Sequence, residues 1–220
     1  MESVKKGNRY HSRGKRDGSC YRFYRFYITF VIKKRVNVTF RAVYRRRVAA
    51  TMQKKREFIE GAFYHVTSRT NDKIRIFDNR LGQKIILLTM QDAKEKFRFR
   101  LANFCIMPTH IHLLIKPEEG ENLSTIMHWI KIHSAKRWNC THGSIDHVWG
   151  QRFFSRPIKD LYDYFAVFQY IDKNPVKSGF VQYPQDWRPS GAYYIANNIS
   201  GFVDYTPFER QGYIRYLPKW

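Results

Sequence analysis

The sequence predicts an α+β domain with a ferredoxin-like antiparallel sheet, helices packed on one face, and a further helix at the C-terminal end. Three observations support this. Strand and helix patterns follow one another in the order β-α-β-β-α-β and then helix. Two apolar runs are separated by only Pro108 and Thr109, which indicates a tight hairpin. The chain of 220 residues is 43% hydrophobic, enough for a core of ordinary size.

The first half of this pattern begins with residues 62–70, AFYHVTSRT, whose aromatic and β-branched residues predict a strand. A helix is predicted within residues 77–97, with Asp78 or Asn79 as its N-cap. Its apolar residues at helical spacing are Leu81, Ile85, Leu88 and Ala93. Residues 97–107 and 110–117 then form the two strands of the predicted hairpin.

The second half follows the turn signal EEGEN at residues 118–122. A helix is predicted over 123–138, with Asn122 as N-cap and an apolar face made of Leu123, Ile126, Ile130 and Ala135. Residues 147–158 predict a fourth strand. A last helix over 160–173 is expected to end at Asn174-Pro175. It is expected to pack on the sheet through Leu161, Phe165 and Phe168, with Tyr164 also in the core.

Charge and residue pattern divide the chain into three parts. Residues 1–51 hold 15 Lys and Arg against 2 Asp and Glu, and they are interpreted as a basic N-terminal extension. The main domain is expected over 52–194, followed by an aromatic and basic tail, 195–220, which either covers a groove of that domain or packs on it. The aromatic and arginine residues of the extension could clamp single-stranded nucleic acid, or the segment is an accessory extension, a disordered tail or the result of a non-native start site.

The net charge of +22 indicates a polyanionic partner, with nucleic acid ahead of a membrane surface. The longest apolar run near the N-terminus is too short to span a membrane, and no signal-peptide pattern is found there. A cytoplasmic location without membrane insertion is therefore expected.

His110 and His112 lie one residue apart in a predicted strand, so both side chains face the same side. Two imidazoles at this spacing can hold a divalent cation, but they leave its shell incomplete. Two half-buried histidines with local hydrogen bonds are the alternative. The remaining histidines are expected to have structural or solvent-exposed roles: His65, His128, His133, His142 and His147.

The final helix offers partners for the histidine pair. Tyr170 falls opposite the predicted packing stripe, and Asn174 lies four residues later on the same side. That side is also expected to carry Asp163, Ala166 and Val167. Asn174 either completes a metal shell or caps a short segment that begins at Pro175. A cation, two histidines and a phenol on a basic protein indicate phosphodiester cleavage through a covalent phosphotyrosine, which allows later rejoining.

Residues 61–194 resemble the single-tyrosine HUH transposases, and specifically the REP-associated tyrosine transposases, which act on repetitive extragenic palindromes. The resembling segments are GAFYHVTSRTNDKIRIF, MPTHIHLLIKP, NLSTIMHWIKIHSAKRWN, VWGQRFFSRPI and YIDKNPVKSGFV. The resemblance implies that His110, His112 and Asn174 bind Mg²⁺ or Mn²⁺ and that Tyr170 is the nucleophile. It further implies cleavage of single-stranded DNA beside hairpins, with a 5′-phosphotyrosine and a free 3′-hydroxyl as products, in a bacterial protein. A monomer and a homodimer both remain open.

Six cations beside the predicted site are expected to contact DNA phosphates: Arg69, Lys131, Lys136, Arg137, Arg152 and Arg156. A ferredoxin-like nucleic-acid-binding protein without catalysis is the alternative function. A replication-initiator relative with the same chemistry is a more distant one.

Overall fold

The computed structural model describes residues 58–204, and the chain divides into two units, residues 1–54 and 55–220. All described residues belong to the second unit. The predictions for the basic extension 1–51, and for the tail beyond residue 204, lie outside the described residues.

The centre of the domain is a four-stranded antiparallel sheet in the order β2-β3-β1-β4. Its strands are β1 (Tyr64–Arg69), β2 (Phe99–Met107), β3 (His110–Pro117) and β4 (Phe154–Pro157). Met107 pairs with His110, so Pro108 and Thr109 form the hairpin turn as predicted. This strand order is the one that a split βαβ arrangement produces, and it confirms the predicted ferredoxin-like architecture.

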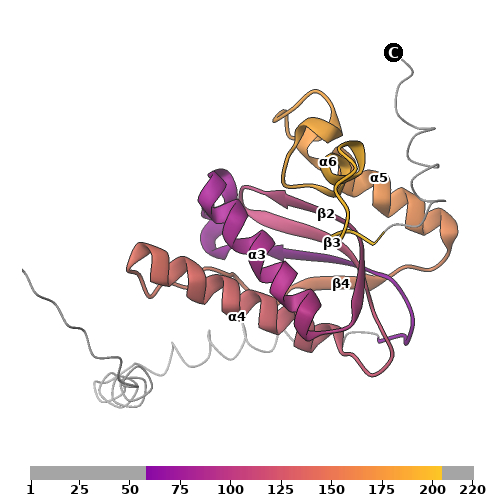
Figure 1. Cartoon of the computed structure of the whole chain (residues 1–220), viewed down its shortest axis with the longest axis horizontal. Coiled ribbons are helices and arrows are strands. Elements are labelled where there is room, and N and C mark those ends of the chain that lie inside the picture. The colour runs from indigo at the N-terminus through magenta and orange to yellow at the C-terminus, as the bar shows by residue number, and fades with distance from the viewer. Residues whose placement is uncertain (1–57, 205–220) are drawn as a thin grey trace, which may run out of the picture. The chain divides into compact units, whose positions relative to one another are not determined.

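Two helices, α3 (Arg80–Lys96) and α4 (Leu123–His142), pack side by side on one face of the sheet (Figure 1). Asn79 caps α3 by accepting a hydrogen bond from the Gly82 amide, and Asn122 caps α4 by accepting from the amides of Ser124 and Thr125. Both caps agree with the sequence prediction. The large core on this face joins apolar residues of α3 and α4 to the side chains of β1, β2 and β3 that point toward them.

The buried face of α3 differs from the prediction. Leu81 and Leu88 are 44% and 43% exposed, whereas Ile86 and Met90 are buried beside Ile85 and Ala93. Gly82 explains this rotation, because a Cβ at residue 82 would lie 2.0 Å from the carbonyl oxygen of Ile76. The helix therefore packs closely at Gly82 on the preceding 3-10 turn, Ile76–Asp78, and the helix face that contains Gly82, Ile86 and Met90 points into the core.

The last long helix, α5 (Leu161–Lys177), packs on the opposite face of the sheet (Figure 1). Its contact stripe is Tyr164, Val167, Phe168 and Ile171, which recur at helical spacing. The predicted burial of Tyr164 and Phe168 is confirmed. Leu161, by contrast, is 73% exposed at the first turn, and Val167, expected beside Tyr170, is buried.

The chain after α5 covers the free edge of β2. A 3-10 turn at Pro184–Asp186 and the short helix α6 (Gly191–Ala196) frame this segment. The Trp187 indole donates to the Ile106 carbonyl at 3.0 Å, and the Ile106 amide donates to the Pro189 carbonyl. These bonds satisfy backbone groups that an edge strand would otherwise expose.

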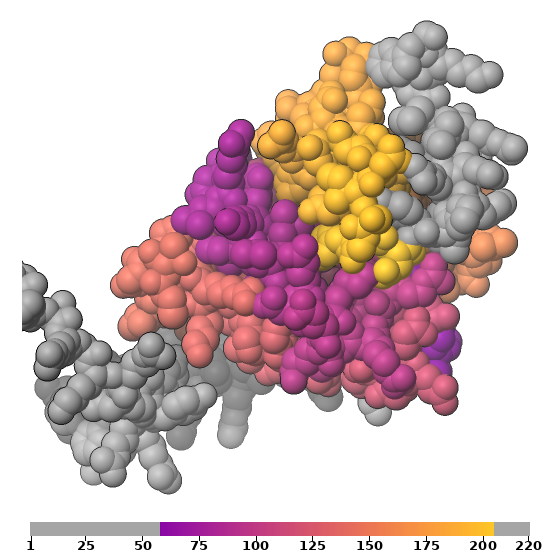
Figure 2. Space-filling model, viewed as in Figure 1, coloured from indigo at the N-terminus to yellow at the C-terminus, as the bar shows by residue number. Residues whose placement is uncertain are grey.

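The expected boundary at residue 194 falls inside α6, and the chain continues into the domain beyond it. Phe202 and Val203 are buried in the core on the α3 side, and Asp204 forms an ion pair with Lys94 at 2.5 Å. Figure 2 shows this yellow segment lying directly against the magenta surface. Of the two roles considered for the tail, the described part packs on the domain. None of the helices within 58–204 has the length and apolar character needed to cross a membrane.

Candidate active site

The two histidines of β3 face α5, away from the larger core. Ile111 and Leu113 alternate with them and are fully buried on the α3 and α4 side. His112 is 4% exposed and His110 is half-buried, with their ring centroids 4.9 Å apart. The shared face that the sequence spacing predicted is confirmed.

Tyr170 of α5 lies against the inner histidine of this pair. Its ring centroid is 5.6 Å from that of His112, and the ring is 42% exposed. A buried imidazole and a half-exposed phenol therefore share one site, although they come from a strand and from a helix on the face opposite α3 and α4.

His65 of β1 is a third histidine in this site, although the sequence predicts only a structural or solvent-exposed role for it. Its Nε2 lies 3.1 Å from His112 Nδ1, and its ring centroid is 5.7 Å from that of Tyr170. The alternation of His65 with buried Tyr64 and Val66 is the signal that the sequence offers. It becomes informative only once β1 is known to pair with β3.

The hydrogen bonds of the β3 histidines leave their outer nitrogens available. Thr67 Oγ1 and His65 Nε2 both contact His112 Nδ1 at 3.1 Å, and Thr109 Oγ1 contacts His110 Nδ1 at 3.0 Å. His112 Nε2 is buried and has no hydrogen-bond partner within residues 58–204. Metal-binding histidines are commonly held by such bonds at one nitrogen while the other binds the cation, so this arrangement fits a metal ligand pair.

Burial keeps these imidazoles in the neutral form that binds metals. Desolvation lowers the pKa of His112 to about 3, with further contributions from His110, His65 and Arg69. Desolvation, followed by the charge of Arg156, lowers the pKa of His65 to about 4. The pKa of His110 is lowered by desolvation and then by Arg69.

Asn174 lies inside α5, half-buried, one turn after Tyr170. The helix continues through Pro175 to Lys177, so the expected helix end at Asn174-Pro175 and the capping role of Asn174 are both wrong. Its Nδ2 donates to the Tyr170 carbonyl at 3.0 Å, which leaves Oδ1 as the acceptor atom of the amide. No three His, Cys, Asp or Glu side chains in the described domain form a group that could hold a metal, so any shell needs another ligand type.

A buried polar pair lies beneath the tyrosine helix. Asp172 Oδ1 accepts a hydrogen bond from Asn103 Nδ2 at 2.9 Å, and the same amide reaches the Phe168 carbonyl at 3.2 Å. Burial raises the pKa of Asp172 to about 7, and its Oδ2 has no hydrogen-bond partner within the described residues. This pair fixes α5 to β2 two residues beyond Tyr170.

The six predicted DNA-contacting cations fall into two groups. Arg137 pairs with Asp92, and Arg156 forms a bidentate pair with Asp163 of α5 at 2.7 Å. The other four lie at or near the surface: Arg69 at the end of β1, Lys131 and Lys136 on α4, and Arg152 before β4. Phosphate contact stays a prediction for all six.

Comparison with known proteins places this sequence in a family. The family model described as "Transposase IS200 like" matches residues 58–174. A Haemophilus influenzae protein assigned as a REP-associated tyrosine transposase is 27% identical over 143 residues, covering 60% of this chain and 81% of that protein. The Escherichia coli REP-associated tyrosine transposase is 29% identical over 90 residues, which are 40% of this chain and 52% of that protein.

A solved structure agrees on the fold. The structure of a REP-associated tyrosine transposase bound to a REP hairpin has a TM-score of 0.58 and 21% identity, covering 71% of this chain and 96% of that one. The resemblance to REP-associated tyrosine transposases is thereby confirmed. The chain belongs to the IS200-like transposase family.

Proposed function

We propose that this protein is a single-tyrosine transposase that cleaves a single DNA strand beside a palindromic hairpin and transfers it through a 5′-phosphotyrosine. The observation that supports this most directly is the contact of Tyr170 with His112, whose buried Nε2 has no partner within the described residues. The proposed nucleophile, Tyr170, thus lies beside the imidazole whose Nε2 is the proposed ligand atom. The relatives described as REP-associated transposases, and the hairpin in the similar structure, support hairpin DNA as the substrate.

His110 and His112 through Nε2, with Asn174 through Oδ1, are the residues that would hold Mg²⁺ or Mn²⁺. When bound, such a cation supplies Lewis-acid polarisation of the phosphodiester. His65 and Thr67 would not bind the cation themselves. They would orient the His112 ring through their contacts with its Nδ1.

Tyr170 Oη forms a bond to phosphorus while the bond from phosphorus to the 3′-oxygen breaks. The phenol proton is lost, and the departing 3′-oxygen takes up a proton to become the free hydroxyl. The 5′-phosphate stays on Tyr170 as an ester, and attack by another 3′-hydroxyl reverses the step. Lys177 Nζ lies 5.4 Å from the centre of the Tyr170 ring, so it provides positive charge where the phosphate must approach.

A labelled hairpin oligonucleotide with single-stranded flanks tests this mechanism. With Mn²⁺, the wild-type protein should form a covalent adduct that survives a denaturing gel, and EDTA should abolish it. Tyr170→Phe should form none. Tyr162→Phe is the matched control, because Tyr162 is 86% exposed on the same helix, and it should react like wild type.

Two outcomes contradict the proposal: no adduct from the wild-type protein, or an adduct that persists in Tyr170→Phe. Hairpin binding that is indifferent to EDTA, without any cleavage, would instead support the non-catalytic nucleic-acid-binding alternative.

The supporting role of His65 has a separate readout. His65→Ala should weaken Mn²⁺ binding about 10- to 100-fold in a calorimetric titration of the free protein. His133→Ala, a half-buried histidine on α4 that contacts the Trp129 carbonyl, is the control and should bind Mn²⁺ like wild type. Unchanged Mn²⁺ affinity in His65→Ala would show that His65 does not support the metal ligands.

A further inference from the structure

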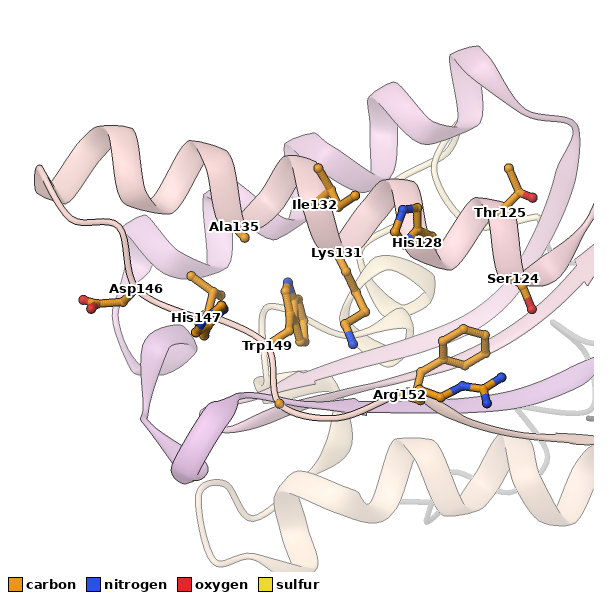
Figure 3. Close-up of a pocket in the computed structure, with 13 residues that line it drawn as sticks. Ser124, Thr125, His128, Lys131, Ile132, Ala135, Asp146, His147, Trp149 and Arg152 are labelled. Carbon is orange, nitrogen blue, oxygen red and sulfur yellow. The ribbon is translucent and has the colours of Figure 1, made fainter. Parts of the chain in front are cut away.

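A groove of about 580 Å³ lies between α4 and the segment that leads into β4. Figure 3 shows Lys131 extending from the helix toward the opposite segment, from which Trp149 rises, with His128 on the helix and Arg152 at one end. Ile132, Ala135 and Val148 add apolar surface to the lining. The groove therefore joins cationic groups to an aromatic and aliphatic surface in one concave site.

The floor of this groove is fixed by the core beneath it. The Trp149 indole donates to Ser134 Oγ at 2.9 Å, and its ring centroid lies 5.4 Å from that of Phe77. Lys131 Nζ donates to the Gln151 carbonyl at 2.8 Å and lies 5.9 Å from the Trp149 ring centre. Trp149 and Lys131 are thus each held by a hydrogen bond to the opposite wall of the groove.

The groove adjoins the candidate active site through the end of β1. Trp149 forms an isolated bridge with Thr70, and the Gly150 amide donates to the Arg69 carbonyl at 3.0 Å. Arg69 is in turn the cross-strand partner of His110. A DNA strand at Tyr170 can therefore pass the end of β1 at Arg69 and reach the groove from there.

We propose that this groove binds an unpaired nucleotide of the DNA strand that is cleaved, a proposal that rests on the function proposed above. A nucleotide carries a flat apolar base beside an anionic phosphate. The groove carries the complementary groups, an aromatic and aliphatic surface beside cationic side chains. Ile132, Ala135 and Trp149 contact the base, and Lys131 and Arg152 contact its phosphates. The groove selects single-stranded flanks, because a base within a duplex cannot leave its stack without cost.

Binding measurements with two DNA probes test the groove. In a Tyr170→Phe background, which prevents covalent capture, a hairpin with single-stranded flanks is compared with the same hairpin without flanks. Lys131→Gln/Arg152→Gln should weaken binding of the flanked hairpin about tenfold and change binding of the bare hairpin by less than about twofold. The slope of log affinity against log salt should fall by about 1.4 for the flanked probe, because each phosphate that is no longer neutralised removes about 0.7.

Matched variants separate the groove from general charge and general surface effects. Arg80→Gln/Lys84→Gln removes the same charge from exposed positions on α3 and should bind both probes equally well. Ile132→Asn should weaken binding of the flanked probe without changing the salt slope, because Ile132 is apolar and 47% exposed in the groove. Leu88→Asn, at 43% exposure on α3, is its control.

Crosslinking locates the nucleotide directly. Flanked hairpins with 5-iodouridine at successive flank positions should crosslink, from at least one position, to a peptide containing His128 or residues 147–149. Equal loss of affinity for both probes, no loss for either, or crosslinks only to other peptides would overturn the proposal. The adduct assay on the wild-type protein judges the proposed function separately, since these binding tests involve no cleavage.

Discussion

Asparagine in place of Asp172 should make the domain more stable above pH 7 and leave its stability nearly unchanged near pH 4. The carboxyl is fully buried under α5, and burial raises its pKa from 3.8 to about 7. The folded state therefore holds this proton more tightly than the unfolded state does. As the pH rises from about 4 to about 7, the unfolded chain releases the proton first, and the wild-type protein loses stability.

The magnitude follows from the same two pKa values. A difference from 3.8 to about 7 corresponds to an upper limit of about 4 kcal/mol, at roughly 1.4 kcal/mol for each pH unit. In Asp172→Asn the new amide oxygen would keep the acceptor for Asn103 Nδ2, and the amide nitrogen would occupy the place of the protonated Oδ2. The substitution therefore mimics the protonated carboxyl at every pH.

Urea unfolding followed by tryptophan fluorescence from pH 4.5 to 8, with EDTA present, measures this difference. The free energy of unfolding of Asp172→Asn minus that of wild type should grow steadily with pH and level off above pH 7. Asp186→Asn, at an exposed carboxylate, is the control. Parallel pH profiles for Asp172→Asn and wild type, or a variant that is less stable at pH 8, would refute the reasoning.

Substitutions at three further positions test individual contacts, each by the urea midpoint. Gly82→Ala should lower stability by about 2 kcal/mol although alanine favours helices, because its Cβ would lie 2.0 Å from the Ile76 carbonyl oxygen; a more stable variant would contradict that contact. Asp163→Asn should cost about 1 kcal/mol at pH 7 by breaking the partly exposed pair with Arg156. The Arg156 hydrogen bonds lower the pKa of Asp163 to about 2. The stability cost of the substitution should therefore be fully present above pH 4 and disappear as the pH falls through 2. A cost independent of pH would argue against the pair. Asn122→Ala should cost about 1 kcal/mol through loss of the α4 cap, and Asn122→Asp, which keeps an acceptor, should not.

The parts of the fold that local patterns determine could be predicted from the sequence. The hairpin turn at Pro108 and Thr109 is short enough to set the pairing of β2 and β3, and the alternation of His110 and His112 with apolar residues assigns their face. The caps Asn79 and Asn122 act through backbone groups a few residues away. These features depend on few residues, all close together in the chain.

The end of α5 shows where a local rule failed. Pro175 predicts a stop, but a proline can stay in a helix when the surrounding packing compensates, and Pro175 is buried. The helix stops before Gly179, which has a φ of 71°, and the Ser178 and Gly179 amides close the last turn. The glycine is the better signal, and its use places Asn174 within the helix.

Other parts of the site depend on pairing between distant segments. His65 joins the site only because β1 lies beside β3, and the groove exists only because Trp149 pairs with Thr70 while α4 lies above it. Arg137 and Arg156 look like free cations in the sequence, but Asp92 and Asp163 come from other elements and pair with them. Such partners become visible only with tertiary structure.

The alternation along β3 links correct folding to activity in this domain. A slip of one residue against β1 would turn His110 and His112 into the core beneath α3 and α4 and would move Ile111 and Leu113 to the face beneath α5. Buried imidazoles without partners would then destabilise the same molecules that had lost these candidate ligands from the site. A chain with β3 in this wrong register would therefore be unstable as well as inactive. The two histidines thus favour the correct register of β3, in addition to being candidate ligands.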